Sequence, residues 1–419
     1  MSALHLQRAV IINGNHSSSH RSVLVAPSRP LPIVRYAYYA FIFSIPFEGV
    51  DIGITSETFT LSKIVGYIFV AVALLQPHLA FRRPPKAFWY FVIYICTFAM
   101  FGILQEPVYY ALFMPQLISQ VQMVILFWIS YNLMQYERVI KGTLLMLAVA
   151  IISLAVLQMF GLIGTTWGRF ARSGALRMDP NSFAAVLSLG LLALIGLAYG
   201  RQEIGKKIHL LFWPACGVLA ITIVSTASRG SMAALTVALL TFLLKDRSIR
   251  SKLKVGVTVL LALGLLVWLS YRSETFRLRW EKTFVEGSLG GREEIYPEVW
   301  RKFLEKPLTG WGPIQISGAL SAPHNLYLEV LIQLGLVGAI PFFMGMWFCL
   351  RAAWKARNGM ESVVPLAMLT CLFLVNMSIT WHNRKLHWIV LAYALASATR
   401  VVFPRLRISV PRPYRLVRS

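Results

Sequence analysis

The sequence predicts an all-α, polytopic membrane protein with about 12 transmembrane helices and one large loop on the periplasmic side. The first observation is composition, because 57% of the 419 residues are hydrophobic and only 14% are charged, which is too apolar for a soluble protein of this size. The second is that the apolar residues form continuous runs. Such runs are typical of membrane-spanning helices, whereas the strands of a membrane barrel alternate in polarity.

The chain begins with a polar, Ser-rich tail at residues 1–31. Its single apolar run, residues 9–12, is too short for the core of a signal peptide. We therefore expect a cytoplasmic tail. Twelve apolar segments follow, at residues 32–48, 60–80, 87–104, 113–134, 140–162, 181–199, 208–226, 230–245, 253–271, 324–350, 362–379 and 386–403.

The positions of the basic residues explain the net charge of +24. Short cytoplasmic loops are enriched in Lys and Arg, and alternate gaps between the apolar segments have this enrichment, as does the tail at residues 404–419. The basic gaps contain Arg82, Arg83 and Lys86; Arg138 and Lys141; Arg201, Lys206 and Lys207; Lys245, Arg247, Arg250, Lys252 and Lys254; Arg351, Lys355 and Arg357. Both termini should be cytoplasmic, and no nucleic-acid partner is predicted.

Four outward gaps carry basic residues against this rule, so these residues require another explanation. They are Arg169, Arg172 and Arg177; Arg229; Arg292, Arg301 and Lys302; and Arg384 with Lys385. We expect Arg384 and Lys385 to extend from the membrane to the interface. Asp179 before Pro180 is expected to cap a helix. Arg229, in a short gap of small polar residues, is either a ligand-binding residue or one partner of a salt bridge.

The long outward loop is predicted at residues 272–323. Its centre can form an amphipathic helix, because Ile295, Val299 and Phe303 recur at helical spacing and Pro297 would lie in the first turn. Gly290 and Gly291 precede this helix, and the Pro- and Gly-rich residues 306–313 end it. The predicted domains are thus the tail 1–31, helices in 32–271, the catalytic loop 272–323, helices in 324–403 and the tail 404–419.

Metal and redox chemistry are not indicated. The four cysteines all lie inside apolar segments, so reduced core thiols are expected rather than a disulfide or a metal site. The chain has three aspartates and no Asp-x-Asp pair, which argues against a metal-dependent nucleotide-sugar transferase. No cofactor is predicted.

The motifs of the outward gaps resemble those of the O-antigen ligase and polymerase superfamily, which assembles bacterial cell-surface polysaccharides. They are a short Ser-Arg-Gly at Arg229, Gly-Gly-Arg at Arg292, the segment PLTGWGP at residues 307–313, and His324. The family's ligases carry His and a polar residue, then nine residues, Gly, two residues and a further Gly, Thr or Tyr. His324-Asn325 followed by Gly335 and Gly338 fits this spacing.

The resemblance implies transfer of a glycan at the outer face of the bacterial inner membrane. The donor would be an undecaprenyl-pyrophosphate-linked glycan, and the acceptor another glycan or lipid A core. By their positions in these motifs, Arg229 and Arg292 correspond to the family's two essential arginines, and His324 corresponds to its essential histidine. Arg169, Arg172, Arg177 and Glu329 are further candidates for binding substrate, and membrane lipid is an expected partner.

The residue chemistry agrees with these roles. Guanidinium groups bind phosphate oxygens through paired, charge-assisted hydrogen bonds, and an imidazole can accept a proton from a hydroxyl near neutral pH. Two alternatives stay open. Glu48, Asp51 or Glu57 in the first outward gap could be the base, and a lipid-linked oligosaccharide flippase or other transporter could have a similar number of helices. The sequence does not distinguish ligation from polymerisation or transfer to protein.

Overall fold

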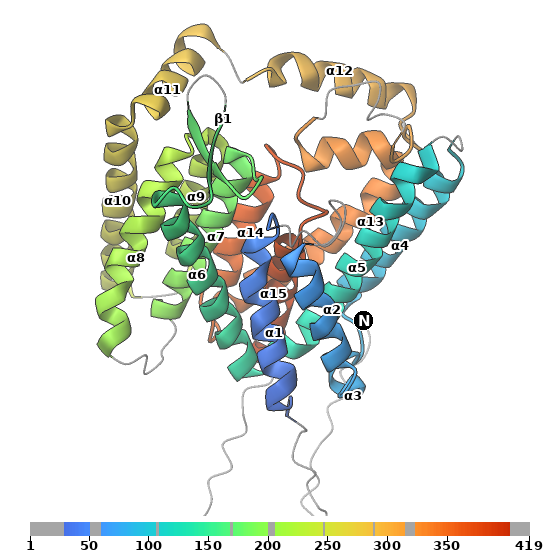
Figure 1. The fold of residues 1–419 in the computed structure, drawn as a ribbon, viewed down its shortest axis with the longest axis horizontal. Coiled ribbons are helices and arrows are strands. Elements are labelled where there is room, and N and C mark those ends of the chain that lie inside the picture. Colours follow the sequence, from blue (N-terminus) through green and yellow to red (C-terminus); the bar gives the residue numbers. More distant parts are fainter. Residues whose placement is uncertain are drawn as a thin grey trace, which may run out of the picture.

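The computed structural model describes residues 29–50, 60–105, 109–167, 171–199, 206–245, 248–287, 290–314 and 323–402. Most of this part of the chain is helical, and the helices form one bundle with α11 (Glu274–Glu286) and α12 (Arg292–Glu305) across one end (Figure 1). The predictions for both tails, Arg169, Asp51 and Glu57 lie outside the described residues.

Each of the twelve predicted apolar segments contains a helix. In chain order they are α1 (Pro32–Ser44) with the 3-10 turn η1 (Ile45–Phe47), α2 (Leu61–Ala73) with α3 (Pro77–Ala80), α4 (Lys86–Ile103), α5 (Tyr110–Met134), α6 (Glu137–Met159), α7 (Pro180–Tyr199), α8 (Lys206–Ser225), α9 (Arg229–Leu240) with η3 (Thr241–Leu244), α10 (Ile249–Arg272), α13 (Leu326–Ala356), α14 (Val364–Val375) and α15 (Lys385–Val402). Within the described chain, six of these helices are long and apolar enough to cross a membrane: α4, α5, α6, α7, α10 and α13. A multi-pass membrane protein is therefore supported, and the count of twelve stays a prediction.

Helix α7 lies in the interior of the bundle, whereas α10 lies at its edge. Of the apolar windows of these two helices, 83% and 22% are buried respectively. Gly190 of α7 lies so close to Ile151 of α6 that a methyl group there would overlap its side chain, and α7 also packs against α14. Helix α7 as a whole is thus held by neighbours on several sides, which gives the residues at its start a rigid base.

A second region of close packing joins α4, α5, α13 and α15 through aromatic rings. The ring centroid of Trp388 lies 4.9 Å from that of Phe91 and 6.0 Å from that of Phe127, and Phe91 also contacts Phe342 edge to face. Large buried rings contribute much of the packing energy of a helical bundle. This cluster fixes α13 and α15, whose first residues lie at the same end of the bundle as α11 and α12.

Helix α13 is broken at Gly335, and a loop inserts its backbone there. Gly335 has φ 57° and ψ −161°, a conformation that glycine adopts without strain. The amides of Trp311 and Gly312 donate to the carbonyls of Ile332 and Gln333 at 2.9 and 2.8 Å, and the amides at positions 336 and 337 donate to carbonyls of the same loop. The PLTGWGP segment thus supplies hydrogen bonds that the interrupted helix lacks.

The long loop contains two helices where the sequence predicted one. Helix α12 buries Val299 and Phe303, which confirms the predicted amphipathic pattern. It begins at Arg292, however, so Pro297 is in its second turn rather than the first. The reason is that Gly290 and Gly291, at φ 80° and 84°, turn the chain immediately before Arg292. Helix α11, which begins after the capping residue Ser273, was not predicted.

Two further features differ from the expectation. A two-stranded antiparallel hairpin, β1 (Gly164–Trp167) and β2 (Arg172–Ala175), projects between α6 and α7; four-residue strands are too short for a clear pattern in the sequence. Cys96 is exposed on α4 rather than buried in the core, whereas Cys349 and Cys371 are buried. A helix in a bundle has an outer side as well as an inward side, and Cys96 is on the outer, exposed side.

Candidate active site

A cavity of about 790 Å³ opens at the end of the bundle covered by α11 and α12. Its walls come from the β1–β2 hairpin, the start of α7, the α8–α9 junction, α11, α12, the start of α13 and the α14–α15 junction. The ionisable side chains along these walls are Arg172, Arg229, Arg279, Arg292, Arg384, His324, Asp179 and Glu329. Five guanidinium groups against two carboxylates make the cavity strongly positive, which favours an anionic ligand.

Arg172, on β2, is fixed between two elements. Its Nε donates to the carbonyl of Thr226 at 3.0 Å and its Nη2 to the side-chain oxygen of Asn181 at 2.8 Å. Asp179 caps α7 as predicted, with its carboxylate accepting from the amides of Asn181 and Ser182 at 2.9 and 3.2 Å. Within the described residues, Arg172 is therefore held by neutral oxygens rather than by a direct salt bridge, and its positive charge stays available to the cavity.

Arg229 and Arg279 hold the α8–α9 junction against α11. The side chain of Arg229 donates to the backbone carbonyl of Arg279 at 3.3 Å, and the side chain of Arg279 donates to the backbone carbonyl of Ala227 at 2.5 Å. Ala227 has a left-handed backbone, φ 49°, so the chain makes a tight turn at this junction. Glu293 on α12 is close enough to act electrostatically on Arg229, so the predicted alternative of a carboxylate partner stays open.

Arg292 is the first residue of α12 and faces the α14–α15 junction. Its Nη2 donates to the backbone carbonyl of Ser378 at 2.9 Å. One turn later, the hydroxyl of Tyr296 donates to the carbonyl of Met377 at 3.0 Å. These two bonds hold α12 against the residues that directly follow α14, and they place Arg292 at the wall of the cavity.

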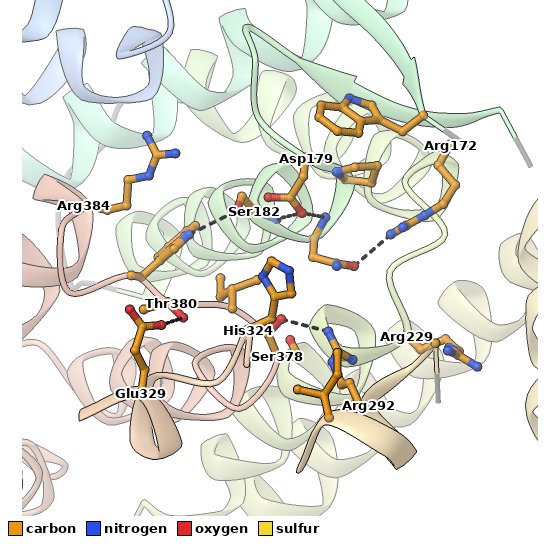
Figure 2. Close-up of a pocket in the computed structure, with 18 of the residues that line it drawn as sticks. Arg172, Asp179, Ser182, Arg229, Arg292, His324, Glu329, Ser378, Thr380 and Arg384 are labelled. Atoms are coloured by element: carbon orange, nitrogen blue, oxygen red, sulfur yellow. Dashed lines mark hydrogen bonds between the residues drawn. The ribbon is translucent and has the colours of Figure 1, made fainter. Parts of the chain in front are cut away.

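His324 lies between Pro323 and the helix cap Asn325. Its side chain is exposed and lines the cavity, and its backbone is left-handed, φ 45°, which is uncommon for a residue with a side chain and enriched at functional sites. The side chain of Asn325 accepts from the amides of Tyr327 and Leu328 at 3.0 and 3.3 Å. In Figure 2, His324 lies centrally, with Arg292 on one side and Glu329 on the other.

Glu329 is in the first two turns of α13 and lines the same cavity. Its carboxylate accepts from the hydroxyl of Thr380 at 2.6 Å and from the amide of Gln333 at 3.2 Å. Two neutral donors therefore orient the carboxylate, and Figure 2 shows the bond from Thr380. Among the described residues, the structure shows no ion pair between Glu329 and a basic side chain. A carboxylate held in this way can accept hydrogen bonds from the hydroxyl groups of a ligand.

Arg384 and Lys385 do not extend freely from the membrane surface, which corrects the prediction for them. Both pair with Glu48 after η1, Arg384 at 3.4 Å, and Lys385 also donates to the hydroxyl of Ser62 at 3.2 Å. The physical reason is that Lys385 is buried, 7% exposed, and a buried ammonium group requires a partner. Glu48 is engaged by these two cations, although its alternative role as a base is not tested by this contact.

The structure gathers most of the predicted site residues and separates one. Arg172, Arg229, Arg292, His324 and Glu329 line the large cavity. Arg177 instead lines a neighbouring cavity of about 250 Å³ with Glu48 and Arg384, because its left-handed backbone, φ 62°, turns the chain between β2 and α7. Arg169 lies outside the described residues.

Arg279 and Asn181 are among the cavity residues that sequence reasoning missed. Arg279 is on α11, which was not predicted; the spacing of Phe276, Trp280 and Phe284 indicates an apolar helix face and could have revealed it. Asn181 is next to the predicted cap, but no pattern in the sequence shows that it contacts Arg172. Such a contact across nine residues depends on how the hairpin folds back onto α7.

Burial lowers the pKa of three of these arginines, Arg172, Arg229 and Arg279. It lowers the pKa of Arg172 to about 10, with Asp179 opposing the effect and Arg229 and Arg292 adding to it. Burial lowers the pKa of Arg279 to about 10 as well, assisted by the positive charges of its three neighbours Arg172, Arg229 and Arg292. Both groups remain protonated at neutral pH, and an anion in the cavity would stabilise them.

Comparison with known families assigns part of the chain. Residues 214–343 match a family model described as O-Antigen ligase, and this segment contains Arg229, Arg279, Arg292, His324 and Glu329. A search of curated proteins finds no match. The family match confirms the predicted resemblance to the O-antigen ligase and polymerase superfamily, and with the apolar helices it indicates a multi-pass membrane enzyme of the glycosyltransferase type.

Proposed function

We propose that this chain, similar over residues 214–343 to O-antigen ligases, transfers a glycan from an undecaprenyl-pyrophosphate carrier to an acceptor hydroxyl. The observation that carries the proposal is the convergence of Arg172, Arg229 and Arg292 with His324 on one cavity. These residues come from four separate parts of the chain. A loop that only covered the end of the helical bundle would not require these residues to line the same cavity.

The arginines suit the leaving group. A pyrophosphate diester carries about two negative charges, and guanidinium groups bind its oxygens in pairs. When the bond between the anomeric carbon and the phosphate oxygen breaks, negative charge grows on that oxygen. Guanidinium groups already held by backbone carbonyls stabilise this charge without rearranging, so we propose that they supply the positive charge and that no metal ion is required.

His324 suits the acceptor. We propose that its imidazole accepts the proton of the acceptor hydroxyl as the hydroxyl oxygen bonds to the anomeric carbon, while the lipid pyrophosphate leaves from the opposite face. This single displacement inverts the anomeric configuration. Glu329, oriented by Thr380 and Gln333, would accept hydrogen bonds from other hydroxyls of the acceptor and hold it in register.

The positive-inside pattern of the sequence supports a periplasmic position for this end of the bundle. The gaps rich in Lys and Arg alternate with the gaps that form the cavity. The lipid carrier would then approach from the outer leaflet of the inner membrane. The acceptor is proposed to be a second lipid-linked glycan or lipid A core.

The test is transfer by the purified chain in detergent micelles, with a synthetic lipid-pyrophosphate oligosaccharide as donor and a labelled glycan as acceptor. Parent protein should form the new glycosidic bond in the presence of a metal chelator, with inverted configuration by NMR. Arg292→Lys should lower the rate, whereas Arg301→Lys, on the exposed side of the same helix, should not.

Micelles also separate transfer from transport, because they enclose no second compartment. Absence of transfer by folded parent protein with either acceptor class, together with movement of the donor across reconstituted vesicles, would replace the proposal by the transporter alternative. A retained anomeric configuration would contradict the single displacement.

A further inference from the structure

Helix α11 contacts the bundle through the apolar side chain of Phe276 and the cationic side chain of Arg279, and Trp280 is partly buried against the same core. Phe276 is buried against the bundle, whereas the ring of Phe284, at the other end of the helix, is 77% exposed. Between them, Arg279 reaches the carbonyl of Ala227 at the α8–α9 junction. The polar part of this docking contact is therefore made at the cavity wall.

The contact between α11 and the junction is reciprocal. Arg279 donates to a carbonyl two residues before Arg229, and Arg229 donates back to the carbonyl of Arg279 itself. The same carbonyl also accepts from the hydroxyl of Thr283 at 2.8 Å. Each arginine thus fixes the backbone that carries the other, so that their positions are coupled.

Arg279 retains donors for a ligand. A guanidinium group has five N–H groups, and within the part of the chain that the structure describes the side chain of Arg279 donates one hydrogen bond. The side chain lines the cavity. The remaining N–H groups are at a half-buried position on the cavity wall, where the oxygens of an anion can accept hydrogen bonds from them.

The surrounding charges favour the same ligand. Arg172, Arg229 and Arg292 each act on Arg279 by electrostatic repulsion. Like charges grouped in a partly buried space disfavour each other unless a counter-charge lies between them. A ligand with about two negative charges and several oxygens can satisfy more than one of these guanidinium groups at once.

We propose that Arg279 is a further substrate-binding residue, which binds the pyrophosphate group together with Arg229 and Arg292 while it holds α11 against the α8–α9 junction. The proposal rests on the proposed glycosyl transfer for the identity of the natural ligand. The claim about binding can be tested without glycosyl transfer, however, because it states that a pyrophosphate anion contacts a residue of α11. This residue lies outside the sequence motifs that indicated the site.

The experiment measures binding of inorganic pyrophosphate to the full chain in nanodiscs by isothermal titration calorimetry. Arg279→Gln should bind about 10- to 100-fold more weakly, the range expected for loss of a charged hydrogen-bonding partner. Arg279→Lys, which keeps the charge and can still reach a carbonyl, should lie between this variant and the parent. Arg277→Gln, an exposed position on the same helix, is the matched control and should bind like the parent.

A double variant separates direct contact from positioning of Arg229. If Arg279 contacts the anion, Arg229→Gln with Arg279→Gln should bind more weakly than Arg229→Gln alone. Equal binding by the double variant and Arg229→Gln would overturn the proposal, because Arg279 would then act only through Arg229. Melting temperatures without ligand, compared among the variants, identify any loss of binding that comes from unfolding.

The two proposals fail in different ways. Pyrophosphate binding that depends on Arg279 in a protein without glycosyl transfer activity would leave this inference standing and overturn the proposed function. Transfer activity with equal pyrophosphate binding by parent, Arg279→Gln and Arg277→Gln would do the reverse. Absence of pyrophosphate binding by the folded parent would overturn the inference directly.

Discussion

Two loops at the cavity end of the bundle carry the same kinds of residue in opposite environments. The loop before α13 presents His324 to the cavity, and Arg292 faces the same space from α12. The loop before α15 also has a histidine and cations, but His382 is buried, 2% exposed, and Arg384 and Lys385 pair with Glu48. Histidine and arginine in an outward loop therefore do not by themselves indicate a site.

The difference lies in what the cations contact. Arg292 donates to the neutral carbonyl of Ser378, which orients the guanidinium group and leaves its charge for a ligand. Lys385 contacts a carboxylate, which neutralises it. Arginines that donate to neutral oxygens form the part of this end suited to an anion, whereas Arg384, which lines the same cavity, and Lys385 are paired with Glu48 and join α1 to α15.

The largest expected effect is at His324. His324→Ala and His324→Gln should each lower the turnover of the reconstituted enzyme by about 10²- to 10⁴-fold, the usual contribution of a general base, because neither side chain accepts the proton. Binding of the donor lipid should stay near that of the parent, since it depends on the arginines. Near-normal turnover by the Gln variant would remove the base assignment.

Glu48→Gln is expected to affect stability rather than chemistry. Lys385 would keep its buried charge without a carboxylate, and loss of one partner of a buried pair costs about 3–5 kcal/mol, reduced here to roughly 3 kcal/mol because Arg384 is partly exposed. The melting temperature in nanodiscs should fall clearly. Turnover per folded molecule should stay near the parent value, and a selective loss of turnover would instead favour Glu48 as the base.

Arg292→Lys tests the role of an arginine that donates to a backbone carbonyl. A lysine keeps the charge but lacks the planar pair of donors, so kcat/KM for the donor should fall about 10- to 100-fold. The matched change Arg384→Lys should have a smaller effect, because its partner Glu48 accepts from an ammonium group as well. Equal losses for the two variants would contradict the distinction between carbonyl-bound and carboxylate-bound cations.

The smallest effect concerns the pH dependence of stability. Burial lowers the pKa of His382 to about 4, whereas an unfolded histidine titrates near 6.5. The unfolded state therefore binds a proton first as the pH falls, so stability present above pH 6.5 is lost between pH 6.5 and pH 4, by about 1.4 kcal/mol at pH 5.5. His382→Gln should show a shallower decline in melting temperature over this range than the parent; parallel curves would show that His382 titrates normally.

Several features of the fold could be predicted from local sequence. The apolar segments, the cap at Asp179 and the buried face of α12 depend on residues close together in the chain, whose spacing is visible in the sequence. The family resemblance added Arg229, Arg292 and His324, and these three do meet at one cavity. Helix α11 and the β1–β2 hairpin were missed because one is largely polar and the other has very short strands.

The sequence by itself determined that the chain is apolar, helical and organised with basic gaps in alternation, since hydropathy and charge act residue by residue. Only the tertiary structure decided which outward cations belong to the cavity. Arg279 lines the cavity because α11 folds back onto Ala227. Lys385 does not, because α1 brings Glu48 against the start of α15 and Lys385 pairs with it. The physical reason is that the availability of a charged side chain for a ligand depends on contacts with residues distant in the chain. The spacing of residues along the sequence does not show which distant residues make those contacts.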